Sequence, residues 1–344
     1  MEEGTMDRDT RGAMDLFYCR FGRAAFTAVI GVIVFSFLAF AQEREQKKFK
    51  SPEAAFSALL EATKNNDTRE IQSVFGPSGK DIMSSGNAAA DKEARKHFVK
   101  AAGDAVKFSK LDDETMLVLI GKDESTFPVP LVKSSQGWVF FAEDGKEEII
   151  NRGIGRNELN AIQVALAYVD AQYEYASKDR DGDGVLQYAR RFVSHAGKRD
   201  GLYWEAAPGE EVSPLGALFV RATEDGYIFR KKGEKPAPYH GYYFRILKGQ
   251  GSNAPGGELD YIIKDRMVAG FGMVAYPAEY GVSGIMTLIV NQEGLVYEKD
   301  LGPKTKEIAK TMTKYDPDKT WKKEEWTPDT LKGDVVNPGA NAFP

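Results

Sequence analysis

The sequence predicts an α+β protein in two parts, each built from helices and an antiparallel sheet. Three observations indicate this class. Helical patterns open each part, short strand-like runs separated by turn residues follow them, and 42% of the residues are apolar with no low-complexity tract. The 344 residues are enough for two domains or one large one. We expect residues 51–150 to form an N-terminal α+β domain and residues 151–315 a C-terminal helix-plus-sheet domain.

The N-terminal segment has the parts of a secretion signal. Basic residues precede an uncharged apolar run over residues 24–41, and the run ends in the small-x-small letters AFA. We therefore interpret residues 1–41 as a signal peptide and residues 42–50 as a charged linker. The run is slightly shorter than the ~20 residues that comfortably span a bilayer, so an uncleaved anchor is the alternative. Both interpretations place the rest of the chain outside the cytoplasm, in the periplasm or the extracellular space.

The net charge and the cysteine content limit the partners and the kinds of stabilisation that are expected. The net charge of −5 gives no support to nucleic acid as a partner. Cys19 is the single cysteine and precedes the apolar run, so the exported part has no disulfide. Its stability must come from a packed core.

The N-terminal domain begins with helix signals. Ser51-Pro52-Glu53 combines a capping serine, a proline at the first helical position and an acid in the first turn. Asp67 and Glu70 have capping-box spacing and predict a second helix. A third helix is expected over residues 92–105.

Three strand-like runs complete this domain, over residues 115–120, 127–132 and 138–142. Pro128 and Pro130 lack the N–H groups that a ladder needs. We therefore expect the middle run to lie at a sheet edge.

The C-terminal domain opens with an amphipathic helix predicted over residues 156–176, where apolar residues recur at steps of three and four. Five strand-like runs follow, over residues 242–247, 259–263, 267–276, 284–290 and 295–299. Gln292-Glu293-Gly294 is typical of the hairpin turn between the last two runs. Residues 316–344 are expected to be a polar tail.

An acidic loop follows the long helix. Asp179, Asp181 and Asp183 have the spacing of positions one, three and five of a calcium loop, and Val185 at position seven would offer its carbonyl. Leu186 at position eight is expected to pack inward. Position twelve is Arg190 instead of a bidentate glutamate, which predicts weak binding. The alternative is a tight turn whose aspartates cap the following segment and bind only water.

A hydrolytic site is the competing hypothesis. It would use His240 or His195 with an acid such as Glu279, acting on an envelope polymer. The sequence holds no nucleophile motif or P-loop, so a structural histidine is the favoured interpretation.

Aromatic residues gather around His240. Tyrosines and a phenylalanine could line a groove for a peptide or glycan, although aromatics at alternating strand positions are more often core. They are Tyr239, Tyr242, Tyr243, Phe244, Tyr276 and Tyr280.

Long blocks of the sequence resemble one bacterial family of exported proteins. These blocks include NRGIGRNELNAIQVALAYVDAQYEYA, DRDGDGVLQYA, GKRDGLYWEA and PYHGYYFRILKGQG. The family is known as domain of unknown function 2950, and the resemblance runs from Ser51 to about Trp321. It implies an envelope or secreted location and no particular activity.

A second resemblance concerns residues 156–302. The long helix, the DGDG loop, the GYYFR run and the final hairpin are similar to the globular heads of pilin-like secretion subunits. Those heads pack a helix on an antiparallel sheet, and some hold calcium in an acidic loop. We therefore expect a non-catalytic binding or structural protein of the cell envelope, with Ca²⁺ as its cofactor and an envelope protein, peptide or glycan as its partner.

Overall fold

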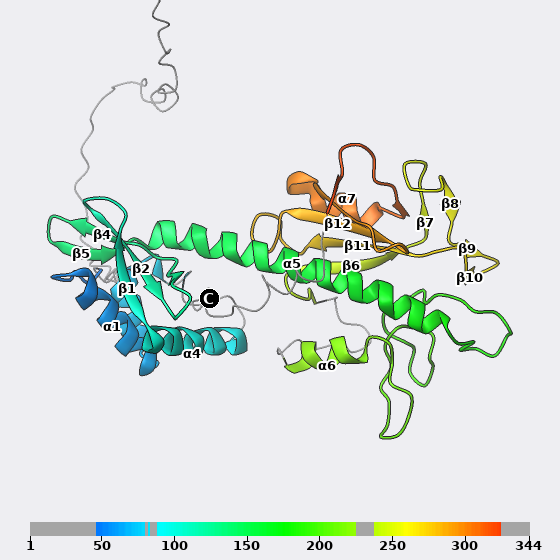
Figure 1. The fold of residues 1–344 in the computed structure, drawn as a ribbon, viewed down its shortest axis with the longest axis horizontal. Coiled ribbons are helices and arrows are strands. Elements are labelled where there is room, and N and C mark those ends of the chain that lie inside the picture. Colours follow the sequence, from blue (N-terminus) through cyan, green and yellow to red (C-terminus); the bar gives the residue numbers. More distant parts are fainter. Residues whose placement is uncertain (1–45, 80–81, 83–87, 225–236, 325–344) are drawn as a thin grey trace, which may run out of the picture. The chain divides into compact units, whose positions relative to one another are not determined.

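The computed structural model describes residues 46–79, 82, 88–224 and 237–324 (Figure 1). It confirms the α+β class, with helices and several antiparallel sheets. The expected signal peptide over residues 1–41 lies outside the described residues, as does most of the polar tail. Within the described part of the chain, no helix has both the length and the apolar character needed to cross a membrane.

Helices α1 (Pro52–Lys64), α2 (Thr68–Phe75) and α4 (Ala88–Asp104) open the N-terminal part. The predicted caps form: Ser51 Oγ accepts a hydrogen bond from the Ala54 amide at 3.2 Å, and Asp67 Oδ1 accepts from the Arg69 and Glu70 amides at 3.1 and 3.0 Å. These bonds satisfy amides that have no partner within the helix.

The N-terminal sheet has the order β1-β2-β4-β5, with β3 paired to β2. Its strands are β1 (Val106–Lys110), β2 (Thr115–Ile120), β3 (Ser125–Thr126), β4 (Leu131–Ser134) and β5 (Gly137–Phe140). The run expected over residues 127–132 is interrupted at its prolines, because Pro128 and Pro130 cannot donate to a ladder. The prediction that this run lies at a sheet edge was wrong, because β4 pairs with both β2 and β5.

One helix, α5 (Ala142–Ala176), contributes to the cores of both parts. It begins at Ala142 rather than at residue 156, so the expected boundary at residue 150 falls inside it. Ala142 packs in the N-terminal core, while Tyr168 and Val169 belong to the C-terminal one. Gly153 and Gly155 interrupt the apolar pattern of the first half. This interruption is why the sequence favoured a later start.

The C-terminal sheet is antiparallel, in the order β15-β13-β12-β11-β6. Its strands are β6 (Tyr242–Leu247), β11 (Gly272–Pro277), β12 (Met286–Asn291), β13 (Val296–Asp300) and β15 (Lys322–Lys323). Gly294, with φ of 72°, occupies the predicted turn between β12 and β13. The segment after residue 316 returns to the sheet, where Lys323 pairs with Tyr297.

Both faces of this sheet are covered. α5 lies on one face, and α7 (Thr305–Thr311) lies on the other (Figure 1). Side chains of β11 alternate between the two layers: Met273 and Ala275 pack with α5, whereas Val274 and Tyr276 pack in the cluster that contains Ala309 of α7. The period of two in a strand produces this division.

Small elements border the sheet. A three-stranded sheet, β14-β7-β8, is formed by β7 (Gly249–Gln250), β8 (Leu259–Asp260) and β14 (Lys314–Tyr315). A hairpin consists of β9 (Ile262–Ile263) and β10 (Arg266–Met267). The 3-10 turn η1 (Gly302–Lys304) precedes α7, and α6 (Gly216–Glu224) follows the loops after α5.

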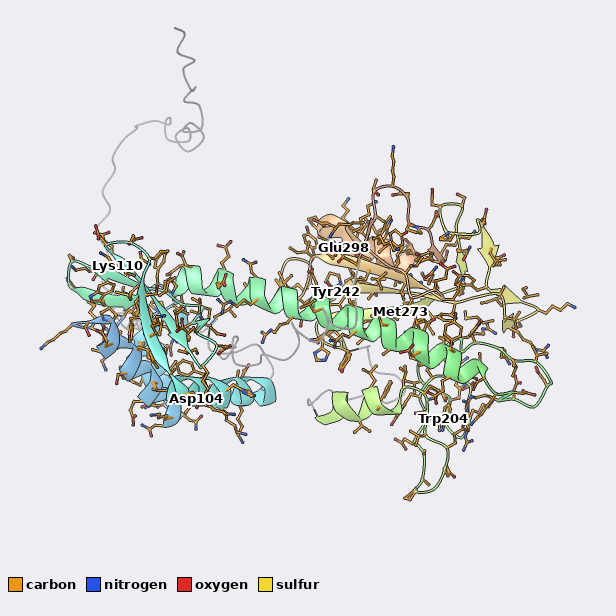
Figure 2. All side chains as sticks on the ribbon, viewed as in Figure 1. Asp104, Lys110, Trp204, Tyr242, Met273 and Glu298 are labelled. Atoms are coloured by element: carbon orange, nitrogen blue, oxygen red, sulfur yellow. The ribbon has the colours of Figure 1, made fainter. Side chains whose placement is uncertain are left out.

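The clustered aromatics are mainly core residues. Tyr242 is fully buried and Tyr276 is 6% exposed. Tyr242 and Phe244 pack on the α5 face, and Tyr243 packs on the α7 face. Figure 2 shows Tyr242 and Met273 beside α5. These aromatics therefore stabilise two layers of the fold rather than lining one groove.

Candidate metal site

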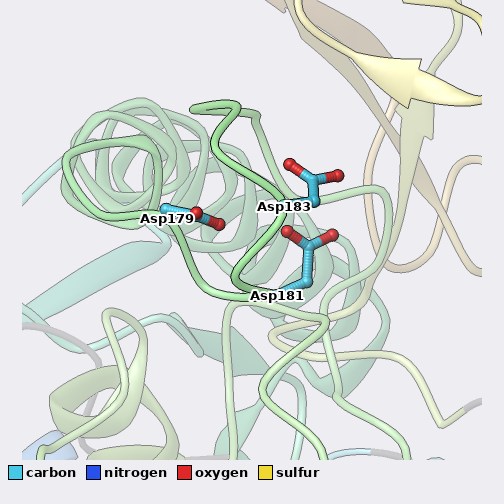
Figure 3. A group of neighbouring side chains, drawn as sticks. All are labelled: Asp179, Asp181 and Asp183. Atoms are coloured by element: carbon cyan, nitrogen blue, oxygen red, sulfur yellow. The ribbon is translucent and has the colours of Figure 1, made fainter.

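Three carboxylates converge on the loop that follows α5. Asp179, Asp181 and Asp183 each place one carboxylate oxygen within 4.8 Å of the others, and all three residues are exposed (Figure 3). Gly182 and Gly184, with φ of 74° and 83°, supply the left-handed conformations of this tight loop. Carboxylate oxygens at this separation could hold a metal ion.

Backbone amides hold Asp179 in place. Its Oδ2 accepts from the Gly184 amide and its Oδ1 from the Gly182 amide, both at 2.8 Å. These hydrogen bonds, that from Gly184 above all, lower the pKa of Asp179 below its usual range. The carboxylate is therefore charged at neutral pH, as a metal ligand must be.

The other two carboxylates have side-chain partners. Gln187 Nε2 donates to Asp181 Oδ2 at 2.7 Å. Asp183 Oδ1 accepts from the Val185 amide at 2.9 Å, and its other oxygen pairs with the Arg266 guanidinium. Arg266 thus supplies a positive charge beside the loop.

Two neighbouring positions depart from a calcium loop. Arg190 Nη1 donates to the carbonyl and to Oδ1 of Asp265, both at 2.7 Å, so it is held by the β9–β10 turn. Leu186 was expected to pack inward, and this was wrong because its exposed fraction is 58%. The loop is followed by an irregular segment rather than a helix, so no helix core receives Leu186.

Two residues that sequence reasoning missed position this loop. Gln172 is fully buried in α5. Its side-chain Oε1 accepts from the Ala189 N–H and its Nε2 donates to the Ala189 carbonyl, both at 2.8 Å. The Arg180 side chain is only 5% exposed, and it pairs with Glu211 at 3.1 Å. The one available signal was Gln172, a polar residue next to the apolar stripe of a predicted helix.

Arg180 also closes the end of α5. Its Nε donates to the Tyr175 carbonyl at 3.2 Å, and its guanidinium lies 5.2 and 5.1 Å from the ring centroids of Tyr175 and Trp204. A cation at a helix C-terminus stabilises carbonyls that have no partner within the helix. These contacts of Arg180 therefore hold the start of the acidic loop in place at the end of α5.

Residues 46–324 match the family model described as Protein of unknown function (DUF2950). The chain belongs to this family. The match confirms the family resemblance, and it includes the acidic loop and both parts of the fold. No curated protein and no solved structure matches the chain.

His195 forms a pair with Asp200. Its Nδ1 lies 2.6 Å from Asp200 Oδ2, and Arg191 Nη1 lies 2.9 Å from Nδ1 and 2.6 Å from Nε2. The ring is therefore in contact with a cation as well as with an acid. The Ser194 hydroxyl donates to the Gly201 carbonyl at 3.3 Å and accepts from the Gly201 amide at 3.0 Å, so its proton is directed to the backbone rather than to His195.

His240 and Glu279 lie on loops at the paired ends of β6 and β11. The Ala278 amide donates to the Gly241 carbonyl at 2.9 Å, which brings these loops together. His240 has φ of 45° and a ring centroid 4.2 Å from that of Tyr239, and Glu279 is exposed. His240 and Glu279 therefore lie on neighbouring loops, whereas His195 lies in a different part of the fold.

Proposed function

We propose that this protein is an exported component of the cell envelope that acts by binding or as a structural element, and that its acidic loop holds Ca²⁺. The carrying observation is the convergence of three carboxylate oxygens within 4.8 Å of one another on one loop. Ca²⁺ prefers six to eight oxygen ligands in flexible geometry, which suits an exposed loop. The apolar run over residues 24–41 supports export.

The ligands proposed are Asp179, Asp181, Asp183 and the Val185 carbonyl. Gln187 stands at position nine, where calcium loops often use a ligand or a water, and its amide already lies at Asp181. Without an acid at position twelve, a Kd of about 10⁻⁴–10⁻³ M is expected, the range of extracellular calcium modules. Residues 156–302 would then be a calcium-holding, pilin-like head, which the helix on an antiparallel sheet supports.

Calorimetric titration of the full chain with CaCl₂ and MgCl₂ tests this proposal. Wild type should bind Ca²⁺ more tightly than Mg²⁺, and Asp181→Asn should weaken the affinity at least tenfold. Asp113→Asn is the matched control, because Asp113 lies in the β1–β2 turn and is 94% exposed. No calcium heat in wild type, or equal affinities for wild type and Asp181→Asn, would refute the ion site.

Arg266 gives a second test of the same site. If Ca²⁺ and Arg266 compete for Asp183, Arg266→Gln should tighten calcium binding. Arg190→Gln removes an equal charge nearby but releases Asp265 rather than a proposed ligand. A larger gain for Arg266→Gln than for Arg190→Gln is expected, and equal gains would mean that Asp183 is not a ligand.

Hydrolysis of an envelope polymer is the second candidate, favoured by the hydrogen bond between His195 and Asp200. Burial alone raises the pKa of Asp200, but the amide and ring of His195 together with Arg191 lower it overall. The Asp200 carboxyl of the His195–Asp200 pair is therefore ionised at neutral pH. His195→Gln should abolish any polymer cleavage by the purified protein, and unchanged cleavage would exclude His195.

A further inference from the structure

A cavity of about 900 Å³ opens beside the acidic loop. Its walls come from the end of α5, the segment over residues 187–200 and the β9–β10 turn. The Tyr188 amide donates to the Met267 carbonyl at 2.8 Å, which joins two of these walls. The volume lies within the range of about 300–1,000 Å³ that small-molecule sites occupy.

Cationic side chains dominate the lining. Besides the buried Arg180, the cavity is lined by Arg190, Arg191, Lys198, Arg199, Lys264 and Arg266. The carboxylates in the lining are Asp181, Asp200 and Asp265. Positive side chains outnumber negative ones, so the cavity attracts anions.

Some of these cations lack a partner. Arg190, Arg199 and Arg266 pair with acids. Within the described part of the chain, the Lys198 and Lys264 ammonium groups make no hydrogen bond or ion pair, and both residues are exposed. Charges that compensate no acid of their own are available to a ligand.

Arg191 adds a third cation. Its side chain lines the cavity and is 41% exposed, and its Nη1 contacts the ring of His195. Its Nε is buried and lies 3.9 Å from Asp200 Oδ2, beyond hydrogen-bond distance. The exposed part of the guanidinium is therefore the part that a ligand can reach.

The turn that carries Lys264 is the two-residue loop of the β9–β10 hairpin. Lys264 and Asp265 have φ of 48° and 67°, because the common type I′ hairpin turn requires positive φ at both of its central residues. Arg190 holds the turn through both the carbonyl and the carboxylate of Asp265. The neighbouring wall thereby keeps Lys264 at the cavity.

We infer that this cavity binds an acidic oligosaccharide, one whose sugars carry carboxylates. Lys198, Lys264 and Arg191 would pair with ligand carboxylates, and the interspersed aspartates would accept hydrogen bonds from sugar hydroxyls. The same aspartates repel a densely charged polyanion such as polyphosphate. Tyr188, partly buried in the wall, offers an apolar surface to a sugar ring. This inference does not require an ion in the acidic loop.

Calorimetry with tetragalacturonate, in buffer freed of calcium by passage over a chelating resin, tests the inference, with maltotetraose as the neutral probe and tripolyphosphate as the dense anion. The full chain should bind tetragalacturonate at least tenfold more tightly than either probe. The Lys198→Ala/Lys264→Ala variant should lose at least tenfold in affinity. Lys310→Ala on α7, an exposed lysine of the opposite sheet face, should behave like wild type.

Four results would overturn the inference. They are no binding of tetragalacturonate, equal binding of maltotetraose, equal or tighter binding of tripolyphosphate, and an unchanged affinity in the double lysine variant. A circular dichroism spectrum like that of wild type shows that the variant is folded. Because the resin removes free Ca²⁺ from the buffer, these results are independent of whether the loop binds the ion.

Discussion

The two parts of the fold are stabilised by different kinds of core. In the N-terminal part, phenylalanines pack edge to face, as Phe127 does with Phe56 and Phe140 at centroid distances of 6.0 Å. In the C-terminal part, tyrosines and amides are buried together: Tyr168 donates to the Gly272 carbonyl at 3.2 Å and accepts from Gln172 at 3.0 Å.

This difference indicates which part of the fold can hold side chains in the fixed positions that a binding site needs. Apolar packing is non-directional and tolerates substitution of similar volume. Buried hydrogen bonds fix particular atoms, as Gln172 fixes Ala189 just beyond the acidic loop. The charged loop and the cationic cavity both lie in the part with the polar core.

The largest effect is expected from Phe127→Ala. Phe127 is 2% exposed at the centre of the N-terminal core, and removal of its ring should cost about 3–5 kcal/mol of unfolding free energy. Urea denaturation measures the loss. If the two cores are separate, the calcium affinity of the folded variant should not change. A parallel loss of calcium affinity would contradict the division between the cores.

Gln172→Leu should come next and should act on the other core. The change leaves the N–H and C=O of Ala189 buried without these partners, at a cost of about 1–3 kcal/mol. The loop would loosen, so calcium affinity should fall together with stability. Gln136→Leu, at an exposed glutamine, is the control. Unchanged affinity in Gln172→Leu would mean that Ala189 does not fix the loop.

Asp67→Ala tests the stability of the N-terminal part through a single helix cap. Loss of the cap on the Arg69 and Glu70 amides should cost about 1 kcal/mol. Asp67→Asn should restore most of the stability, because asparagine is an equally good cap. Thermal unfolding of the three proteins measures the difference. Equal melting temperatures for Asp67→Ala and wild type would show that the cap contributes nothing.

The smallest effect is a pH dependence in the C-terminal sheet. Burial, with the nearby Glu324, raises the pKa of Glu298 above its usual range, although Lys322 opposes this. A raised folded-state pKa means that stability present below the unfolded-state pKa is lost as pH rises through the folded-state pKa. Glu298→Gln should therefore be more stable than wild type at pH 7 by less than about 1 kcal/mol, and the gain should vanish at pH 4.

Urea midpoints of wild type and Glu298→Gln at the two pH values measure this change. An equal difference at pH 4 and pH 7 would show that the Glu298 carboxyl does not titrate in the way its surroundings predict.

The sequence predicted those parts of the fold that depend on local patterns. The caps at Ser51 and Asp67, strand β6 and the turn at Gly294 follow from residue type and spacing. The start of α5 was missed, because the apolar stripe begins only after its glycines. Residues 322–323 were expected in a tail, since their pairing with β13 depends on a long-range contact.

The site was predictable only in part, for the same reason. The aspartate spacing identified the loop, since its ligands are close in sequence. Arg266 and the hairpin turn at Lys264 are distant from the loop along the chain, and only the fold brings them to it. The contact of Arg191 with both ring nitrogens of His195 could not be predicted from the sequence either.

Hydrogen–deuterium exchange of the full chain, with and without 5 mM CaCl₂ (a concentration above the roughly millimolar upper limit expected for Kd), tests the central claim most directly. If the acidic loop holds Ca²⁺ on the polar core, amides over residues 177–190 should become protected, including those of Gly182 and Gly184. Amides over residues 51–141 should exchange at unchanged rates. No protection in the loop, or equal protection in both parts, would contradict the account.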